Sequence, residues 1–358
     1  MKRKLLVASL LLLALSCGRS DRYIHIRGYA QGGVYSVKIN TEGVGLFPEE
    51  IRFSIDSILT LIDTTLSGYN KGSLLSRFNR GEAITPNGLF LDMYEEARRW
   101  YDLSEGAVDC AAGPVFDIWG FGFTADSLPP VRLVEETLAS CGMERLSPSL
   151  RPLPGPDGTL SPSSLLRPEA ASGALPVLNY NAIAQGLSCD MVASWLYSIG
   201  VKDMLVDIGE IFCDGLNPSG EGWTVGIDRP SDGNNTPGAD LEGIWKSDGG
   251  PCGLVTSGNY RKFYVHKGRK YSHTIDPRTG FPAESTLLSA TVAVHPSCPE
   301  GAAFPAAAAD AIATWCMVIG TEQAKELILS MEGVEGCLVS SAPDGSMVSW
   351  RSPGFSGL

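Results

Sequence analysis

The spacing of hydrophobic positions predicts helices along most of the chain. Within 48–62, apolar side chains recur every three or four residues, as on one face of a helix, at Ile51, Ile55, Ile58, Leu59 and Ile62. Comparable patterns predict further helices over 90–101, 129–142, 182–200, 306–319 and 322–331. Gly320 follows the helix over 306–319 directly, which is typical of a helix end.

Alternating and short apolar runs predict strands between these helices. Apolar and polar residues alternate within 28–44, which indicates strands with one buried face. Shorter runs predict strands over 204–208, 223–227, 252–256, 262–267, 289–294 and 336–340, the last leading into a hairpin. Helices and antiparallel-looking strands are interspersed without an internal repeat, so we predict an α+β fold. Residues 147–176 are rich in Pro, Ser, Gly and Leu and predict a long loop insertion.

The first residues have the pattern of an export signal. Three basic residues over 2–4 precede an apolar run over 5–15, which is too short to span a bilayer. Ser16 and Cys17 then resemble the cleavage site of a bacterial lipoprotein. We expect residues 1–16 to be removed and acyl chains on Cys17 to anchor the chain to a membrane. The alternative is an ordinary secretory signal in which Cys17 is incidental.

We expect four parts along the chain, of which the signal peptide is the first. Residues 1–16 are the lipoprotein signal peptide and 17–30 a tether. One domain then occupies 31–345, and 346–358 form a C-terminal tail.

Composition narrows the possible functions. Among 358 residues, 44% are hydrophobic and 19% are charged, which indicates a globular protein and excludes wholesale disorder. The net charge of -12 argues against a nucleic-acid partner, because phosphate backbones require clustered Lys and Arg. Nine cysteines occur at irregular spacing without a CxxC pair, and those at 189 and 316 lie in apolar stretches. We expect mostly free, buried thiols and no zinc site.

One loop contains a histidine, a rare residue in this chain. His273, one of four histidines, lies three residues before Asp276 in a stretch punctuated by Pro277, Gly280 and Pro282. A histidine suits proton transfer because its unperturbed pKa lies near neutral pH. The same residues suit a plain β-turn, with His273 as a half-buried strand residue. The pattern alone leaves both interpretations open.

A second candidate site lies on the helix predicted over 306–319. Asp310 and Thr314 are four residues apart, so they share one helix face. A carboxylate and a hydroxyl together suit a hard cation such as Mg²⁺. The alternative is a structural role, in which Asp310 caps the first turn and Thr314 bonds back to the chain.

Three other stretches combine glycines with polar or aromatic residues: 66–73, 106–122 and 179–186. Gly186 permits close backbone approach to a ligand, and Asp190 begins the polar side of the following helix. Trp119 and Phe121, between glycines, suggest the wall of a pocket, although core packing explains them equally well.

Taken in order, these segments resemble the FAD:protein FMN transferase family, the ApbE-type flavin transferases. The most specific match is the run Ser-His-x-Ile-Asp-Pro-x-Thr-Gly-x-Pro over 272–282. Thr-Ser-Gly-x-Tyr-Arg precedes it over 256–261, and Ala-Asp-Ala-x-x-Thr follows it over 309–314. Matching pieces run from about residue 66 to 320, nearly the whole chain after the signal.

The resemblance implies a fold and an activity. Members of the family have a T-fold-like α+β structure that holds FAD between two halves. With Mg²⁺ they split FAD, join FMN to a Thr or Ser hydroxyl of a partner flavoprotein through a phosphoester bond, and release AMP. Such flavinylation takes place on the extracytoplasmic, periplasmic side of a bacterial membrane, which agrees with a lipid on Cys17.

The resemblance also implies roles for individual residues. The expected Mg²⁺ ligands are Asp310, Thr314 and the carbonyl of Ala182. His273 is the candidate for the general base and Asp276 the second candidate. The residues expected to line the FAD site are Tyr69, Ala107, Val108, Asp109, Asn179, Gln185 and Ile275.

The chain departs from the family pattern at two positions near this site. Gln185 stands where many members have Lys or Glu, and Gly209 is single where the family usually has two glycines. Two other functions therefore remain open: a Mg²⁺-dependent FAD pyrophosphatase that gives FMN and AMP, and a non-catalytic FAD-binding lipoprotein. The reaction product distinguishes the three.

Overall fold

The structure is a computed structural model that describes residues 22–357 except 121–127, 152–156, 167–175, 232, 235, 237, 260–262, 267, 268 and 273. The expected signal peptide and Cys17 lie outside the described residues. Within the described ranges, no helix combines the length and apolar character needed to cross a bilayer.

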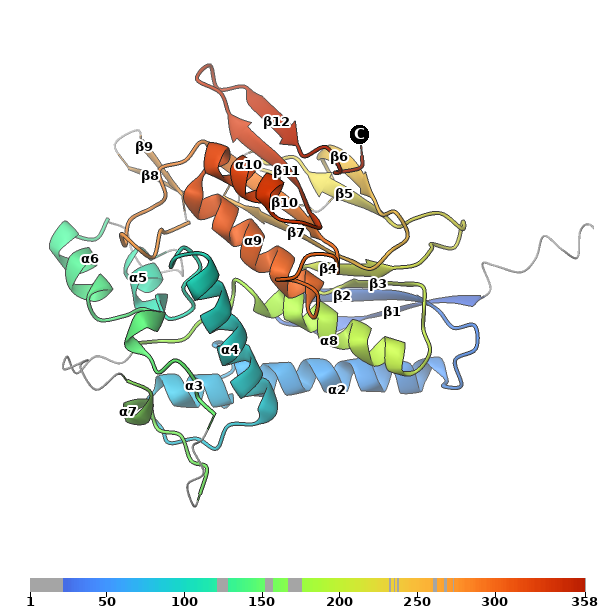
Figure 1. The fold of residues 1–358 in the computed structure, drawn as a ribbon, viewed down its shortest axis with the longest axis horizontal. Coiled ribbons are helices and arrows are strands. Elements are labelled where there is room, and N and C mark those ends of the chain that lie inside the picture. Colours follow the sequence, from blue (N-terminus) through green and yellow to red (C-terminus); the bar gives the residue numbers. More distant parts are fainter. Residues whose placement is uncertain are drawn as a thin grey trace, which may run out of the picture.

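An eight-stranded sheet forms the centre of the molecule, and all its neighbouring strands are antiparallel (Figure 1). In spatial order, its strands are β1 (Tyr23–Ala30), β2 (Gly33–Asn40), β3 (Met204–Asp207), β4 (Ile211–Asp214), β7 (Cys252–Gly258), β10 (Leu287–Val294), β11 (Val334–Ser341) and β12 (Met347–Arg351). The predicted α+β class is confirmed, because helices cover this antiparallel sheet instead of linking parallel strands.

The N-terminal edge of the sheet begins in the expected tether. Residues 23–30 form β1, which pairs with β2 across a two-residue turn. Gln31 and Gly32 in this turn have φ angles of 52° and 80°, which suit the twist of a tight hairpin. The chain therefore joins the sheet at Tyr23.

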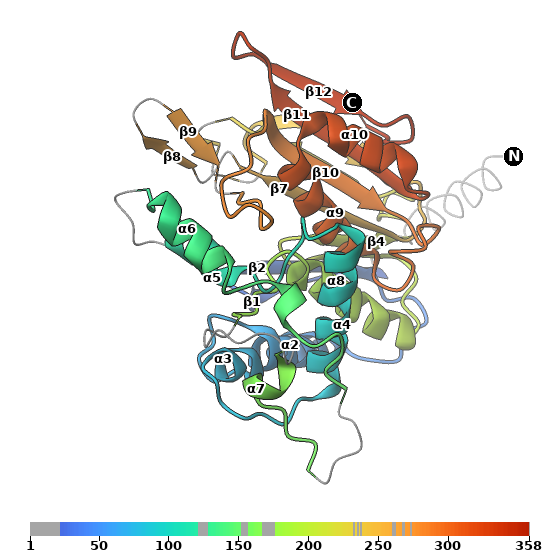
Figure 2. The same cartoon turned by 60° about the vertical axis from the view of Figure 1, so that its left-hand side comes forward.

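One face of the sheet is covered by the helices α2 (Pro48–Leu66), α8 (Ala184–Ser198), α9 (Pro305–Ile319) and α10 (Thr321–Ser330). The helix α8 packs on β3 and β4, and α9 packs on β7 and β10 (Figure 2). Gly253 makes the second contact close, because a Cβ there would lie 2.4 Å from Ala306 N. The two helices also pack against each other over the middle of the sheet.

The opposite face of the sheet is covered by a hairpin of β5 (Thr224–Asp228) and β6 (Leu241–Lys246). Trp223 and Trp245 are buried there against Cys213 and Cys252. All eight cysteines within the described residues are buried and free, which confirms the prediction of free, buried thiols.

The remaining helices form a separate group at one end of α2 and α8 (Figure 1). They are α3 (Leu74–Asn79), α4 (Gly88–Leu103), α5 (Gly113–Ile118), α6 (Val131–Leu138), the 3-10 turn η2 (Met143–Arg145) and α7 (Pro162–Leu165). Within the loop expected over 147–176, the structure describes α7 and a bridge between Ile84 and Leu160. A separate hairpin of β8 (Phe263–His266) and β9 (Arg269–Ser272) precedes the loop at 274–282.

Candidate active site

The helices α8 and α9 carry the predicted metal site, and each supplies a carboxylate to the first turn of the other. Asp310 on α9 is 4% exposed, and its Oδ2 accepts a hydrogen bond from Gly186 N at 3.2 Å. Asp190 on α8 accepts hydrogen bonds from Ala306 N at 3.0 Å and from Ala307 N at 2.8 Å. The expectation that Asp190 begins a polar helix face is wrong, because this contact buries it.

Gly186 is the point of closest approach between the two helices. A Cβ at this position would lie 2.2 Å from Ala306 O and 2.7 Å from Ala307 Cα. We expected Gly186 to admit a ligand, but the α9 backbone occupies that space. The glycine therefore serves the helix crossing.

Each of the three expected metal ligands has an oxygen without a hydrogen-bond donor among the described residues. Gly186 N bonds only to Oδ2 of Asp310. The Ala182 carbonyl receives no backbone N–H there, because the Gly186 amide four residues later is turned toward Asp310. Thr314 is partly exposed, and its hydroxyl makes no bond back to α9 within the described chain. The structural alternative for Thr314 is therefore not observed.

A second carboxylate approaches Asp310 from the turn between β3 and β4. Burial, together with the nearby charge of Asp310, raises the pKa of Glu210 well above its usual value. Burial also raises the pKa of Asp310, while the hydrogen bond from Gly186 opposes this effect. A cation at this position would offset the repulsion between the two carboxylates.

The single-glycine turn that contains Glu210 is held by α8. Gly209 has a φ of +94°, and a Cβ there would lie 2.5 Å from Gln185 Nε2. Gln185 Nε2 donates to Ile208 O at 3.3 Å, and Cys189 Sγ donates to Glu210 O at 3.0 Å. The strands on either side remain paired, so the missing second glycine does not disrupt the sheet.

The donor set fits Mg²⁺. A carboxylate, a hydroxyl and a carbonyl are hard oxygen ligands, and Mg²⁺ commonly uses one or two carboxylates together with water or substrate phosphates. Across the described ranges, no group of three or more His, Cys, Asp or Glu side chains is arranged to hold a metal. Asp310, Thr314 and Ala182 would therefore supply three of the Mg²⁺ ligands. Water or substrate phosphate oxygens would supply the others.

The expected FAD-lining segment at 107–109 is rigidly held. Ala107 and Val108 are buried, so they contribute mainly backbone to a site. Asp109 Oδ1 accepts from Ala111 N at 2.7 Å and from Met143 N at 3.1 Å. Burial nevertheless raises the pKa of Asp109 to about 6. Its carboxylate thus ties this segment to η2.

Asn179 lies beside that segment and connects it to the metal site. Asn179 N donates to Cys110 O at 2.7 Å, and Asn179 Oδ1 accepts from Asn181 N at 2.9 Å. The pKa of the Cys110 thiol is raised by burial and also by the charges of Asp109 and Asp310. The structure therefore brings 107–110, Asn179 and Asp310 into one neighbourhood.

The loop that follows His273 packs on α5 and α6. Ile275 is buried and bridges to Pro282. Trp119 Nε1 donates to Gly280 O at 2.7 Å, and its ring meets the Phe281 ring edge-on at 6.0 Å between centroids. Trp119 therefore anchors the family-type loop and does not line the metal site.

Asp276 forms both a turn and an ion pair. Its carbonyl accepts from Thr279 N at 3.2 Å, as the β-turn interpretation predicts, and also from Gly280 N at 2.8 Å. Its Oδ1 accepts from Arg278 Nε and its Oδ2 from Arg278 Nη2, both at 2.9 Å. This pair occupies the carboxylate of the second candidate base. His273, the first candidate, lies outside the described residues.

Tyr69 stands apart from the other site residues. It is 80% exposed in the turn after α2, and its amide donates to Ser67 Oγ at 3.2 Å. The next helix, α3, is tied to the residue before Asn179, because Asn79 and Leu178 exchange hydrogen bonds of 2.8 and 3.0 Å. The exposed Tyr69 ring is available to stack on a planar ligand.

A cavity beside the 274–282 loop has a volume of about 1360 Å³. It lies between the loop at 276–286, the ends of α6 and α9, and the hairpin of β11 and β12. Among the predicted site residues, Asp276 lines it, whereas the metal ligands do not. This volume exceeds the usual range of about 300–1,000 Å³ for small-molecule pockets.

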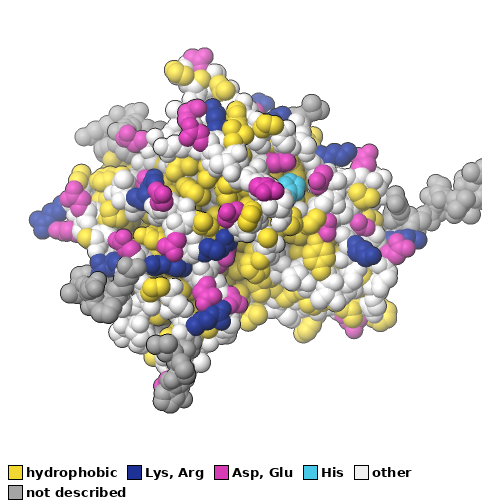
Figure 3. Space-filling model, in the orientation of Figure 1, with side chains coloured by type: hydrophobic (Ala, Val, Ile, Leu, Met, Phe, Trp, Pro, Cys, Tyr) yellow, Lys and Arg dark blue, Asp and Glu magenta, His cyan; other side chains and the backbone are white. Residues whose placement is uncertain are grey.

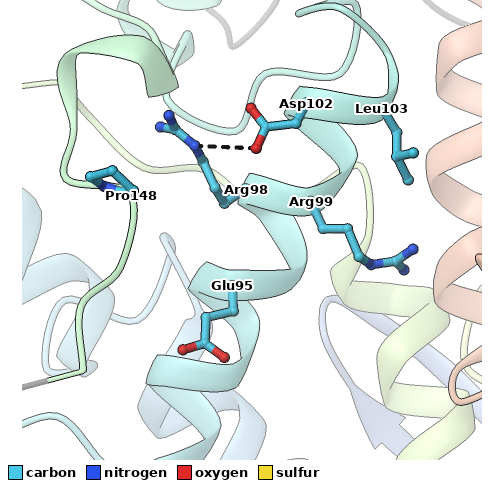
Figure 4. Close-up of a pocket in the computed structure, with 6 residues that line it drawn as sticks. All are labelled: Glu95, Arg98, Arg99, Asp102, Leu103 and Pro148. Carbon is cyan, nitrogen blue, oxygen red and sulfur yellow. Dashed lines mark ion pairs between the residues drawn. The ribbon is translucent and has the colours of Figure 1, made fainter.

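A smaller hollow of about 490 Å³ lies beside α4 and Pro148 (Figure 4). Its charged side chains are already paired, Arg98 with Asp102 and Arg99 with Glu96. Basic and acidic side chains are also interspersed over the face shown in Figure 3. The hollow contains none of the predicted site residues, and we assign it no function.

Sequence reasoning missed three residues that shape the site. Glu210 follows Gly209 directly after a buried strand, and that position was a signal for a site carboxylate. Asp190 was interpreted as exposed, and nothing local distinguishes a buried from an exposed carboxylate at that helix position. Arg278 lies two residues after Asp276 and could have been recognised as its ion-pair partner.

The fold and sequence match proteins of known activity. A Vibrio cholerae protein named FAD:protein FMN transferase is 33% identical over 327 residues, which cover 88% of this chain and 87% of the relative. The Haemophilus influenzae protein of that name is 30% identical and covers 90% of this chain and 87% of its own. The structure of the flavin transferase ApbE from V. cholerae superposes with a TM-score of 0.73 at 29% identity, covering 93% and 98% of the two chains.

The family comparison covers both halves of the site. The family model described as the ApbE family matches residues 31–338, a range that contains the α8–α9 crossing, the 107–109 segment and the 274–282 loop. The chain therefore belongs to the ApbE family.

Proposed function

We propose that this protein transfers FMN from FAD to a Thr or Ser hydroxyl of a partner protein and releases AMP. The observation that carries the proposal is the α8–α9 crossing, where Asp310, Thr314 and the Ala182 carbonyl each present an unused oxygen. The relatives named FAD:protein FMN transferase support the transfer of FMN from FAD to a protein.

Mg²⁺ bound by these oxygens would neutralise charge on the pyrophosphate of FAD. Gly186 N and Asp190 hold the two ligand-bearing helices, so Asp310 meets the substrate in a fixed position. Positioning is the main requirement, because phosphoryl transfer leaves little covalent work to the protein.

The acceptor hydroxyl attacks the phosphorus of the FMN moiety, and the bond from that phosphorus to the bridging oxygen breaks. The bridging oxygen leaves with AMP. His273 accepts the proton of the hydroxyl, since its unperturbed pKa lies near neutral pH. Asp276 is the less suitable base, because both its oxygens are held by Arg278.

The residues expected to line the FAD site offer chemical groups that suit FAD. Tyr69 offers an exposed ring for stacking, and the buried residues Ala107 and Val108 offer backbone groups. Asn179 and Gln185 supply amides that approach from the α8 side. Ile275 supplies an apolar side chain from the 274–282 loop.

The protein acts on the extracytoplasmic side of a bacterial membrane in this proposal. The basic and apolar pattern over 2–15 followed by Cys17 supports export and lipid attachment. Metabolic labelling with a radioactive fatty acid tests the anchor: label should appear on the native chain and be lost in Cys17→Ala.

A product assay tests the activity. A form lacking residues 1–17 is incubated with FAD, Mg²⁺ and a peptide that carries an acceptor Thr. Mass spectrometry should show an FMN-sized adduct on the peptide, and chelation of Mg²⁺ should abolish it. Asp310→Asn should lower the rate by about 100-fold or more, because it removes a charged ligand while an amide oxygen can still accept from Gly186 N.

Asp203→Asn provides the control. Like Asp310, Asp203 accepts a hydrogen bond from a backbone amide, that of Leu216 at 2.9 Å. Its other oxygen accepts from Tyr23 of β1 and Asn40 of β2, so Asp203 has no contact with α9 among these bonds. The Asp203→Asn variant should keep the wild-type rate of FMN transfer. Free FMN and AMP without an adduct would identify a pyrophosphatase, and intact bound FAD would identify a flavin-binding protein.

A further inference from the structure

We propose that Asp190 is a positioning residue for the metal site: it sets the place of α9 on α8 so that Asp310 and Thr314 meet the Ala182 carbonyl. The proposal rests on the proposed function, because it concerns the same Mg²⁺ site. It assigns a role to a carboxylate that contacts neither the expected metal nor FAD.

The first argument is that α9 lacks a cap of its own. Phe304 occupies the N-cap position with φ -140° and ψ 74°, and its side chain accepts no hydrogen bond. The first amides of a helix have no partner within the helix. Here the amides of Ala306 and Ala307 donate to Oδ1 and Oδ2 of Asp190 instead. The cap of the ligand-bearing helix is therefore supplied by α8.

The second argument is that the two helices brace each other reciprocally. On α8, Gly186 provides an amide and Asp190, four residues later, a carboxylate. On α9, Ala306 provides an amide and Asp310, four residues later, a carboxylate. Each carboxylate accepts from the amide of the opposite helix, so a shift of either helix by one turn would break both contacts.

The third argument is that little space remains for α9 to adjust. A Cβ at Gly186 would lie 2.2 Å from Ala306 O on one side. A Cβ at Gly253 of β7 would lie 2.4 Å from Ala306 N on the other side. The start of α9 is thus packed tightly between α8 and the sheet. Asp190 fixes the position of α9 along its own axis, because it holds the first amides of that helix.

The test uses the full-length protein in detergent and compares Asp190→Asn with Asp203→Asn. Asparagine at position 190 keeps one acceptor oxygen and turns an N–H donor toward the second α9 amide. Binding of Mn²⁺, measured by electron paramagnetic resonance, should weaken at least tenfold in Asp190→Asn. Asp203→Asn should lower the thermal midpoint comparably and leave Mn²⁺ affinity within twofold of wild type.

Mn²⁺ affinity equal to that of wild type in a folded Asp190→Asn variant would overturn the positioning role. If this variant does not fold, amide hydrogen exchange of the wild-type protein without metal decides the question. The amides of Ala306 and Ala307 should then be protected as strongly as those of the middle of α9. Exchange as fast as at a frayed helix end would contradict the proposed brace.

The two proposals fail in different ways. Wild-type protein that binds no Mn²⁺ at all would overturn the metal site, and the role of Asp190 with it. Wild-type protein that binds Mn²⁺ and transfers FMN, together with an Asp190→Asn variant that binds as tightly, would overturn only the role of Asp190.

Discussion

Thr314 and Thr65 are both threonines on helices, but their hydroxyls have opposite surroundings. Thr65 is buried, and its Oγ1 accepts from Asn87 Nδ2 at 2.9 Å. Thr314 is partly exposed one turn after Asp310, and its hydroxyl has no hydrogen bond in the part of the chain that the structure describes. The first hydroxyl therefore stabilises the fold, and the second is available to a ligand.

This contrast predicts opposite effects of the same substitution. Thr314→Val should leave the thermal midpoint nearly unchanged and weaken Mn²⁺ binding by about 10-fold or more, because it removes only a ligand oxygen. Thr65→Val should lower the free energy of unfolding by about 1 kcal/mol and leave Mn²⁺ binding unchanged, because it removes a buried hydrogen bond. Calorimetry and Mn²⁺ titration of both variants provide the comparison. A large loss of stability in Thr314→Val would show that its hydroxyl has a structural partner.

At the scale of elements, the start of α9 depends on glycines in its neighbours. Gly253 lies in a strand, where glycine is normally unfavourable, yet its missing side chain lets the α9 backbone contact β7. Four consecutive alanines over 306–309 complete this close packing. The position of Asp310 above the sheet follows from these small residues.

Gly253→Ala should therefore destabilise the protein strongly. The new Cβ would meet the α9 backbone, which cannot move aside as a flexible side chain can, so we expect a loss of about 1–3 kcal/mol in the free energy of unfolding. Gly45→Ala is the matched control, because a Cβ there meets nothing within 4 Å. Urea unfolding curves measure both. Equal stability of the two variants would mean that α9 can shift at little cost.

The helices and most strands were predictable because their signals are local. The helix expected over 306–319 is α9 at Pro305–Ile319, and the strand expected over 289–294 is β10 at Leu287–Val294. The pairing of β4 with β7 was not predictable, since it joins residues about 40 positions apart through tertiary packing. The family resemblance supplied the expected ligands, whereas the buried state of Asp190 required the structure.

At the scale of the whole molecule, several buried carboxylates make stability depend on pH. Burial raises the pKa of Asp109 to about 6 and also raises those of Asp310 and Glu210. The folded protein therefore holds these protons more tightly than the unfolded chain, in which carboxyl pKa values are about 4. Their contribution to stability is fully present below about pH 4 and is lost as the pH rises through the folded-state values.

The metal-free protein should consequently be less stable at pH 8 than at pH 5. Mg²⁺ should increase stability more at pH 8, because burial raises the pKa of Asp310 to about 7 and this carboxylate is then ionised and attracts the cation. Thermal unfolding at both pH values, with chelator and with excess Mg²⁺, gives the four required midpoints. A Mg²⁺ effect that is larger at pH 5 would show that Asp310 does not face the cation.

The eight buried thiols have a consequence for how the protein matures. None of them is bridged, and the apolar core on both faces of the sheet is complete without a covalent link. The described part of the fold therefore needs no disulfide bond, and no oxidant is required to form one.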